Sequence, residues 1–208
     1  MFYSQYSEDK LINDLLQGKT EGFVVDVGAA DGVRYSNSRY FIESLGWGGV
    51  LVEPHPDYFK ALQQLYSPYS SSHQVRVLNC AVGPEEGTMP FYLYGRDEHA
   101  QVSTLSEEFK NRVISVHGDK YEAQPVEVEV KHLRTVLQDL PGPVDLLSID
   151  CEGIDMSVLQ SHDWKDQRPN IVCVEHSMPM FELHNFMISM RYKFIISTEG
   201  NSIFQAIN

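Results

Sequence analysis

The chain has 208 residues, in which 29 acidic side chains against 16 basic ones give a formal net charge of −13. This length predicts a single domain that folds without disulfides or metal, and 42% hydrophobic residues with 22% charged ones exclude a disordered protein. The negative charge and the lack of a basic stripe argue against nucleic acid as a partner, because a polyanion would be repelled.

Taken in chain order, apolar runs alternate with amphipathic segments. Residues 11–16 carry apolar side chains on one helical face, and residues 23–27 and 50–53 are two predicted strands. A helix with apolar positions at helical spacing follows over 58–66, and residues 75–82 are predicted to form a third strand. This alternation is typical of an α/β fold.

Two later strands and a hairpin complete the predicted sheet. Residues 144–150 and 171–175 are apolar enough to be buried on both faces, as in a parallel sheet covered by helices. At the end of the chain, 194–197 and 203–207 flank the turn residues 199–202, which predicts an antiparallel hairpin.

Residues 84–140 lie between the third and fourth of these core strands and have a pattern of their own. Residues 89–94 and 126–130 alternate like half-exposed strands, and 103–116 has partly helical character. We expect an insertion within a single domain of residues 1–208. It either covers the active face or extends the sheet, and the two arrangements are compatible.

No segment has the pattern of a targeting or membrane-spanning sequence. The first ten residues carry Glu8 and Asp9 and no apolar run, unlike a signal peptide, and no apolar stretch approaches the roughly 20 residues that cross a bilayer. The three cysteines, Cys80, Cys151 and Cys173, include no CxxC pair. We therefore expect free thiols, a cytoplasmic protein and no membrane contact.

Residues 25–32 combine a strand end with a glycine-rich turn. Gly28 and Gly32 permit positive φ angles and let a ligand approach the backbone closely. Glu53 ends the next predicted strand, 25 residues after Gly28, and an acid in that place accepts hydrogen bonds from both hydroxyls of a ribose. A plain turn explains the glycines alone, but the paired acid favours an adenosine-containing ligand.

The charge of this loop distinguishes between two adenosine cofactors. A dinucleotide fingerprint has a glycine where this loop has Ala30, and it holds a pyrophosphate at a helix N-terminus. Asp26 and Asp31 would repel a pyrophosphate, whereas they suit a ligand with an ammonium and a sulfonium group. The loop therefore favours S-adenosylmethionine. An NAD-linked oxidoreductase on a Rossmann-like fold is the second hypothesis.

The order of the motifs resembles that of the FkbM-type family of class I methyltransferases. The matching stretches are SQYSED at 4–9, FVVDVGAADG at 23–32, SNS at 36–38, GWGGVLVEP at 46–54, NCAVG at 79–83, STL at 103–105, LSIDCEG at 147–153 and VE at 174–175. The resemblance implies a Rossmann-like sheet of about seven mostly parallel strands with a C-terminal antiparallel hairpin and helices on both faces.

The resemblance also implies which residues would hold S-adenosylmethionine. The methionine part and the ribose would lie on Asp26, Gly28, Ala29, Asp31 and Gly32. The remaining contacts would be Glu53 on the ribose hydroxyls, Pro54 and Ala81 beside the adenine, and Gln5, Asn37 and Ser38 at the amino-acid end.

Four polar side chains end two neighbouring predicted strands, where parallel sheets hold reactive groups. Asp150 and Glu152 follow one strand, and Glu175 and His176 end the next. Methyl transfer to an alcohol needs a base or a metal near the methyl group. Asp150, Glu152 and His176 are therefore the candidate catalytic residues. Candidate ligands of Mg²⁺ or another divalent cation are Asp150, Glu175 and His176; without a metal, Asp150 would contact the methionine part and His176 would be the base.

The family's substrates are mostly hydroxyl groups of sugars or natural products, so the resemblance implies O-methylation of a glycan or small-molecule acceptor. Aromatic side chains that could stack on a sugar ring, although such side chains more often belong to a core, are Tyr35, Trp47, Tyr92, Tyr94 and Tyr121. We expect the insertion, the N-terminal segment or a second subunit to recognise the acceptor, which leaves a homo-oligomer open. A cofactor-binding module without catalysis is the third hypothesis.

Overall fold

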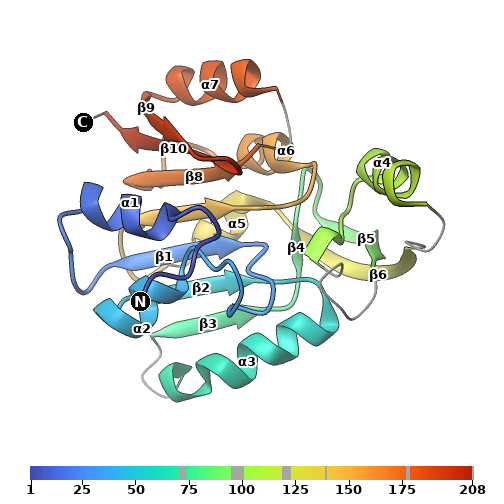
Figure 1. Ribbon diagram of the computed structural model, residues 1–208, viewed down its shortest axis with the longest axis horizontal. Coiled ribbons are helices and arrows are strands. Elements are labelled where there is room, and N and C mark those ends of the chain that lie inside the picture. Colours follow the sequence, from blue (N-terminus) through green and yellow to red (C-terminus); the bar gives the residue numbers. More distant parts are fainter. Residues whose placement is uncertain (71–73, 95–100, 119–122, 139, 177–178, 208) are drawn as a thin grey trace.

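The computed structural model describes residues 1–70, 74–94, 101–118, 123–138, 140–176 and 179–207 (Figure 1). Its largest element is a seven-stranded sheet. The strands, in spatial order, are β3 (Val75–Leu78), β2 (Gly48–Val52), β1 (Phe23–Val27), β7 (Leu146–Ile149), β8 (Ile171–Glu175), β10 (Asn201–Ala206) and β9 (Tyr192–Ser197).

The sheet is mostly parallel, as the apolar runs predict. Strands β3, β2, β1, β7 and β8 pair in parallel, whereas β10 runs antiparallel to both β8 and β9. Every residue of β7 is buried, and only the first residue of β1 and of β2 is partly exposed. The predicted α/β class, the seven strands and the C-terminal hairpin are all confirmed.

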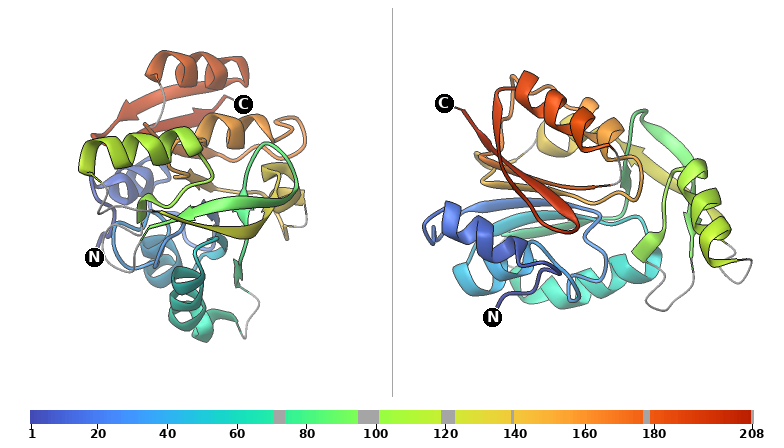
Figure 2. Two further views of the ribbon diagram at one scale, coloured as in Figure 1. Left: turned by 90° about the vertical axis from the view of Figure 1, so that its right-hand side faces the viewer. Right: turned by 45° about the horizontal axis from the view of Figure 1, so that its top comes forward.

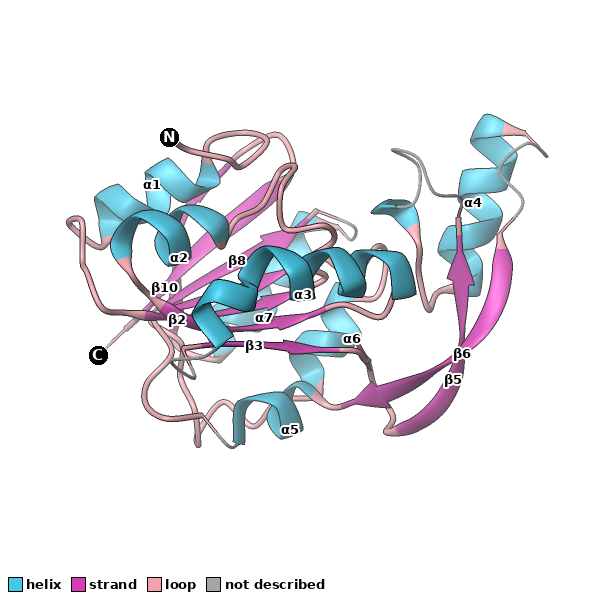
Figure 3. Cartoon of the chain, turned by 90° about the horizontal axis from the view of Figure 1, so that it is seen from below, coloured by secondary structure: helices cyan, strands magenta, loops and turns pink. Residues whose placement is uncertain are grey.

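Helices cover both faces of this sheet (Figures 1 and 3). One face carries α1 (Glu8–Leu15), α2 (Arg39–Leu45) and α3 (Pro56–Ser70), whose side chains form a core with alternate residues of the strands. The opposite face carries α5 (Leu133–Gln138), α6 (Asp155–Gln160) and α7 (Met180–Ser189). In the described part of the chain, every helix is too short or too polar to cross a bilayer.

The middle of the chain forms a second sheet. Its strands pair in the order β4 (Ala81–Val82), β6 (Gln124–Lys131) and β5 (Gly87–Leu93), and α4 (Glu107–His117) packs beside them. Figure 1 and the left view of Figure 2 show β5, β6 and α4 beyond the carboxyl ends of the parallel strands. Within the predicted insertion, 95–100, 119–122 and 139 lie outside the described residues.

The prediction of one strand over residues 75–82 is wrong. The chain leaves the main sheet after Leu78, and Ala81 and Val82 pair with β6 in the second sheet instead. Asn79 lies in the break, where its side-chain amide donates to the Glu53 carbonyl oxygen at 3.0 Å. A largely apolar run does not reveal a change of sheet, because the pattern of a strand does not say with which strand it pairs.

Candidate active site

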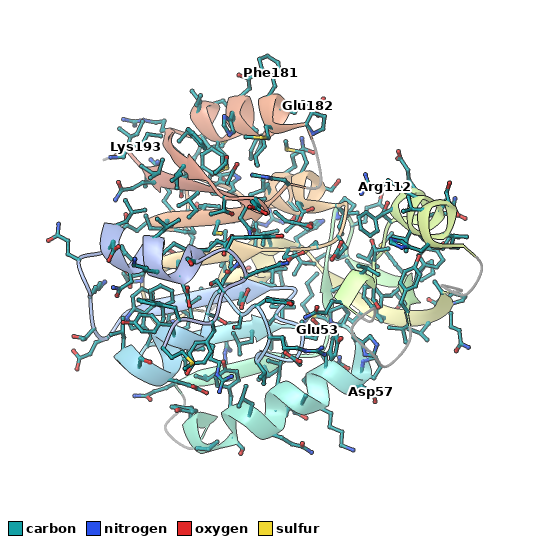
Figure 4. The ribbon with its side chains drawn as sticks, in the orientation of Figure 1. Glu53, Asp57, Arg112, Phe181, Glu182 and Lys193 are labelled. Atoms are coloured by element: carbon teal, nitrogen blue, oxygen red, sulfur yellow. The ribbon has the colours of Figure 1, made fainter. Side chains whose placement is uncertain are left out.

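A cavity opens at the carboxyl ends of β1, β2, β7 and β8, with the second sheet along its other side. Carboxylates from four strand ends line it: Asp26, Glu53, Asp150, Glu152 and Glu175. Figure 4 labels Glu53 near the end of β2. Because parallel strands bring their carboxyl ends to one edge of a sheet, a single cavity collects acids that are far apart in the sequence.

Gly28 joins the two halves of this cavity. Its φ of +83° is in the left-handed region, and a Cβ atom there would lie 1.8 Å from the backbone oxygen of Asp150. Any side chain at this position would therefore push the β1 loop away from the β7 loop. The backbone N–H groups of Gly28 and Ala29 both donate to the Val52 carbonyl oxygen, at 3.0 and 3.1 Å.

Glu53 is held by the backbone around it. One carboxylate oxygen accepts the N–H of Ala30 at 2.8 Å, and the other accepts the N–H of His55 at 2.7 Å. The residue is 5% exposed, and burial raises the pKa of its carboxyl to about 7, with Asp26 and Asp150 adding to the rise and the two backbone bonds opposing it. Both oxygens keep lone pairs, which suits a pair of neighbouring hydroxyl groups.

Asp26 lies deeper, at the end of β1. Burial raises the pKa of its carboxyl to about 6, against hydrogen bonds from Ser38 and Ser148. The Ser38 hydroxyl donates to Asp26 at 2.5 Å, and the Asn37 amide donates to the Ser148 hydroxyl at 3.2 Å. The loop before α2 thus fixes the orientation of the Asp26 carboxylate.

Most residues predicted to hold the cofactor line this cavity. They are Gln5, Asp26, Gly28, Ala29, Asn37, Glu53, Pro54, Ala81 and Asp150. They come from the N-terminal segment, the ends of β1, β2 and β7, the loop before α2 and the start of β4.

Three of the predicted cofactor residues lie behind the lining. Asp31 accepts the backbone N–H groups of Val33 and Arg34 at 2.8 and 2.9 Å, so its carboxylate organises its own turn. Gly32 packs against α3, where a Cβ atom would lie 2.6 Å from the Leu62 side chain. Ser38 is buried, and its hydroxyl contacts two residues that line the cavity, Asp26 and Ser36.

Asp150, Glu152 and Glu175 form a compact group of acids. One carboxylate oxygen from each lies within 4.8 Å of the others. Burial raises the pKa of all three carboxyls, and Asp155 raises it further. Asp150 adds to the rise at Glu152 and Glu175, whereas a hydrogen bond with Glu175 lowers the pKa of Asp150. Within the described part of the chain, the buried Glu175 Oε2 has no hydrogen-bond partner. Such a group holds either protons or a cation, and its oxygen ligands suit a hard divalent ion.

The structure does not bring His176 into this group. Its ring Nε2 lies 2.9 Å from the Ser202 hydroxyl, and its backbone N–H donates to the Gly200 carbonyl at 2.8 Å. Successive side chains along an extended strand point to opposite sides, so Glu175 and its neighbour face different surroundings. The sequence predicted metal ligands at Asp150, Glu175 and His176, but the third member of the group in the structure is Glu152.

The second sheet contributes lining residues to which sequence reasoning gave no role. Phe91, Gln101, Ser103 and Leu105 face the cavity from β5 and the segment after it. The motif at 103–105 was a visible signal, but a sequence pattern does not say which cavity a distant segment lines.

The aromatic candidates for stacking divide into different environments. Tyr35 is 55% exposed and lines the cavity, whereas Trp47 and Tyr94 are buried. Tyr92 is covered by Lys110, whose ammonium lies 4.4 Å from the ring centroid. Tyr121 lies outside the described residues.

Two buried acids of the SQYSED motif, Glu8 and Asp9, hold the N-terminal segment in place. Glu8 accepts hydrogen bonds from Thr198 at 2.6 Å and Asn201 at 3.0 Å in the β9–β10 hairpin. Asp9 accepts the backbone N–H of Tyr3 at 2.5 Å. These contacts fix the segment that carries Gln5, which lines the cavity.

Known protein families and proteins resemble this chain in sequence. A family model described as "Methyltransferase FkbM domain" matches residues 26–195. "Methyltransferase 1" of Beauveria bassiana is 29% identical over 154 residues, which are 69% of this chain and 59% of that protein. The chain therefore spans less than two thirds of that relative.

Solved structures share the fold. The crystal structure of methyltransferase FkbM from Methylobacillus flagellatus KT superposes with a TM-score of 0.54 at 15% identity, covering 89% of this chain and 43% of that one. The precorrin-6y C5,15-methyltransferase from Geobacter metallireducens GS-15 gives a TM-score of 0.54 at 12% identity, covering 96% and 87%.

Proposed function

This chain belongs to the FkbM methyltransferase family, and from that premise we propose that it transfers a methyl group from S-adenosylmethionine to a hydroxyl group of a sugar, a glycan or a small natural product. The observation that carries the proposal is the cavity lined by carboxylates from four strand ends. A cationic cofactor gains from such surroundings, whereas a pyrophosphate is repelled.

The residues at the ends of β1 and β2 fit this cofactor. Glu53 keeps acceptor lone pairs on both oxygens and would take the ribose hydroxyls. Pro54 and Ala81 would flank the adenine, and Gln5 and Asn37 would face the amino-acid end. When bound, S-adenosylmethionine supplies an electrophilic methyl group on a sulfonium.

The acids at the ends of β7 and β8 would serve the acceptor. An alcohol must lose its proton as it attacks, and a carboxylate with a raised pKa is a suitable base. Burial and the neighbouring charge of Asp155 raise the pKa values of Asp150 and Glu152 in the required direction. We assign Asp150 and Glu152 to this role and leave His176 out of it.

A divalent cation fits the same group. Asp150, Glu152 and Glu175 offer three oxygen ligands, and Glu175 has a buried oxygen without a hydrogen-bond partner in the described residues. Mg²⁺ bound there would lower the pKa of an alcohol and hold it beside the methyl group. Full turnover in the presence of a chelator would remove the metal from this proposal.

The second sheet would recognise the acceptor. Phe91, Ser103 and Leu105 line the cavity on the side of the sheet ends where the acids gather. This placement supports the expectation that the insertion covers the active face.

The experiment is a methyl-transfer assay with radiolabelled S-adenosylmethionine against a panel of sugars, glycans and hydroxylated natural products. We expect a labelled ether product from at least one hydroxyl compound, and at least about 10²-fold slower formation of it by the Asp150→Asn variant. Binding of NAD in place of S-adenosylhomocysteine would favour an oxidoreductase. Cofactor binding without turnover on any acceptor would favour a module that has lost catalysis.

A further inference from the structure

The loop that carries Glu152 has a backbone conformation that needs support. Glu152 has φ of 50°, in the left-handed region, and Gly153 follows with φ of 100°. A residue other than glycine adopts this region at a cost, and it stays there only when its surroundings hold it. The Cys151 N–H, which donates to Asp155 at 2.8 Å, anchors the loop toward α6.

Thr104, in the segment between β5 and α4, supports the same loop from the opposite side. Its hydroxyl donates to the Glu152 carbonyl oxygen at 2.7 Å and accepts the Ser106 N–H at 2.8 Å. The residue is 1% exposed. Its backbone N–H donates to the Tyr92 carbonyl oxygen at 3.2 Å, and its carbonyl oxygen accepts the Tyr92 N–H at 2.8 Å. These two bonds to β5 fix the position of the backbone that carries the hydroxyl.

Helix α4 completes the support. Ser106 caps it by accepting the Phe109 N–H at 3.0 Å, and the Phe109 ring covers Gly153, where a Cβ atom would lie 2.8 Å from Cδ2. One turn further on, the Arg112 guanidinium opposes the charge of Glu152. Figure 4 marks Arg112 on this helix. Thr104 and Phe109 of the insertion therefore contact the short loop that carries Glu152, and Arg112 offsets its negative charge.

We propose that Thr104 is a positioning residue: its hydroxyl holds Glu152 in the left-handed conformation that directs the carboxylate toward Asp150 and Glu175. The insertion and the acidic group then act as one unit, although they are about fifty residues apart in sequence. This inference rests on the proposed role of Glu152, and the test separates the two.

The test compares four variants of the full chain by calorimetric titration with Mn²⁺ and with S-adenosylhomocysteine. Thr104→Val keeps the shape and removes the hydroxyl, and Thr104→Ser keeps the hydroxyl. Glu152→Gln is the reference for loss of the carboxylate. Thr88→Val is the matched control, since it makes the same substitution at an exposed position of β5.

We expect Thr104→Val to weaken Mn²⁺ binding about tenfold, the size of effect that outer-shell partners of metal ligands have. Affinity for S-adenosylhomocysteine should stay unchanged, which also shows that the variant is folded. Thr104→Ser should restore Mn²⁺ binding, and Thr88→Val should leave it unchanged. Thr104→Ala is the second hydroxyl-free variant if valine prevents folding. If the wild type binds no Mn²⁺, turnover of an acceptor is compared across the same variants.

Two results would overturn the inference in distinguishable ways. If Glu152→Gln loses Mn²⁺ binding or turnover and Thr104→Val does not, Thr104 has no positioning role, and the proposed function stands. If Glu152→Gln itself behaves like the wild type, the proposed role of Glu152 fails, and positioning by Thr104 fails with it.

Discussion

The two halves of the cavity hold their acids in opposite ways. At the ends of β1 and β2, Glu53 accepts hydrogen bonds from two backbone N–H groups, and Asp26 accepts one from a serine hydroxyl. At the ends of β7 and β8, Asp150, Glu152 and Glu175 have their carboxylate oxygens close to one another. The first half is organised before any ligand arrives, whereas the second is a set of like charges that needs protons or a cation.

This difference suggests a division of labour. Carboxylates that hydrogen-bond donors already hold in place can accept hydrogen bonds from hydroxyl groups without rearranging, which is what recognition of a ribose requires. Carboxylates that repel one another store a cost that a cation or a proton relieves, which is what an acid–base or metal site requires. Gly28, against the Asp150 carbonyl, is the point where the halves meet.

The largest expected effect comes from breaking the second half. Asp150→Asn should lower turnover by about 10²- to 10⁴-fold, the range attributed to a general base. The same change removes one charge from a repelling group, so the melting temperature of the ligand-free variant should rise. Steady-state kinetics and thermal unfolding check both parts. Wild-type turnover, or a lower melting temperature, would contradict the account.

The next effect comes from breaking the first half. Glu53→Ala should weaken binding of S-adenosylhomocysteine by about 1–3 kcal/mol, because the ribose loses charge-assisted hydrogen bonds and two buried N–H groups lose their acceptor. Turnover at saturating cofactor should change much less. Calorimetry and a comparison of KM with kcat measure this, and an unchanged affinity would remove Glu53 from the cofactor site.

The pH dependence of stability provides a smaller effect. Burial raises the pKa of Asp26 from 3.8 to about 6 and that of Glu53 from 4.5 to about 7. The folded state therefore binds more protons than the unfolded state between these values, so the stability of the ligand-free protein falls as pH rises through about 4 to 7.

Thermal unfolding at about pH 5 and about pH 8 tests this direction, with an expected loss of a few degrees at the higher pH. The Asp26→Asn variant is the control, because it cannot deprotonate at this position and should show a smaller loss. A wild-type melting temperature that rises with pH, or an equal loss in the variant, would contradict the assignment.

The smallest effect is expected at Asp31, which sequence reasoning placed on the cofactor. Its carboxylate accepts backbone N–H groups of its own turn and pairs with Arg34 at 3.3 Å. Asp31→Asn should change the affinity for S-adenosylhomocysteine by less than about twofold, as for other substitutions away from a site. A loss as large as that of Glu53→Ala would return Asp31 to the cofactor contacts.

The fold could be predicted because the apolar residues in the sequence indicate which strands are buried. Strands covered on both faces need continuous apolar runs, and β1, β2, β7 and β8 have them. The switch between β3 and β4 could not be predicted, since an apolar strand pattern does not say with which sheet the strand pairs.

The site was predicted as far as strand ends determine it. Asp26, Glu53 and Asp150 lie at or near strand ends and line the cavity, whereas their expected roles came from the glycine loop and the family resemblance. Gly32 has the positive φ that the sequence suggested, but it serves packing against Leu62 rather than a ligand. His176 was misassigned because neighbouring residues at a strand end face opposite ways. The buried acid Glu8 depends on Thr198 and Asn201, nearly the whole chain away.

One measurement tests the division of labour most directly: calorimetric titration of S-adenosylhomocysteine into the wild type, Glu53→Ala and Glu152→Gln. The account predicts binding by the wild type, an affinity at least about fivefold weaker for Glu53→Ala, and wild-type affinity for Glu152→Gln. Equal weakening in the two variants, or no binding by the wild type, would contradict it.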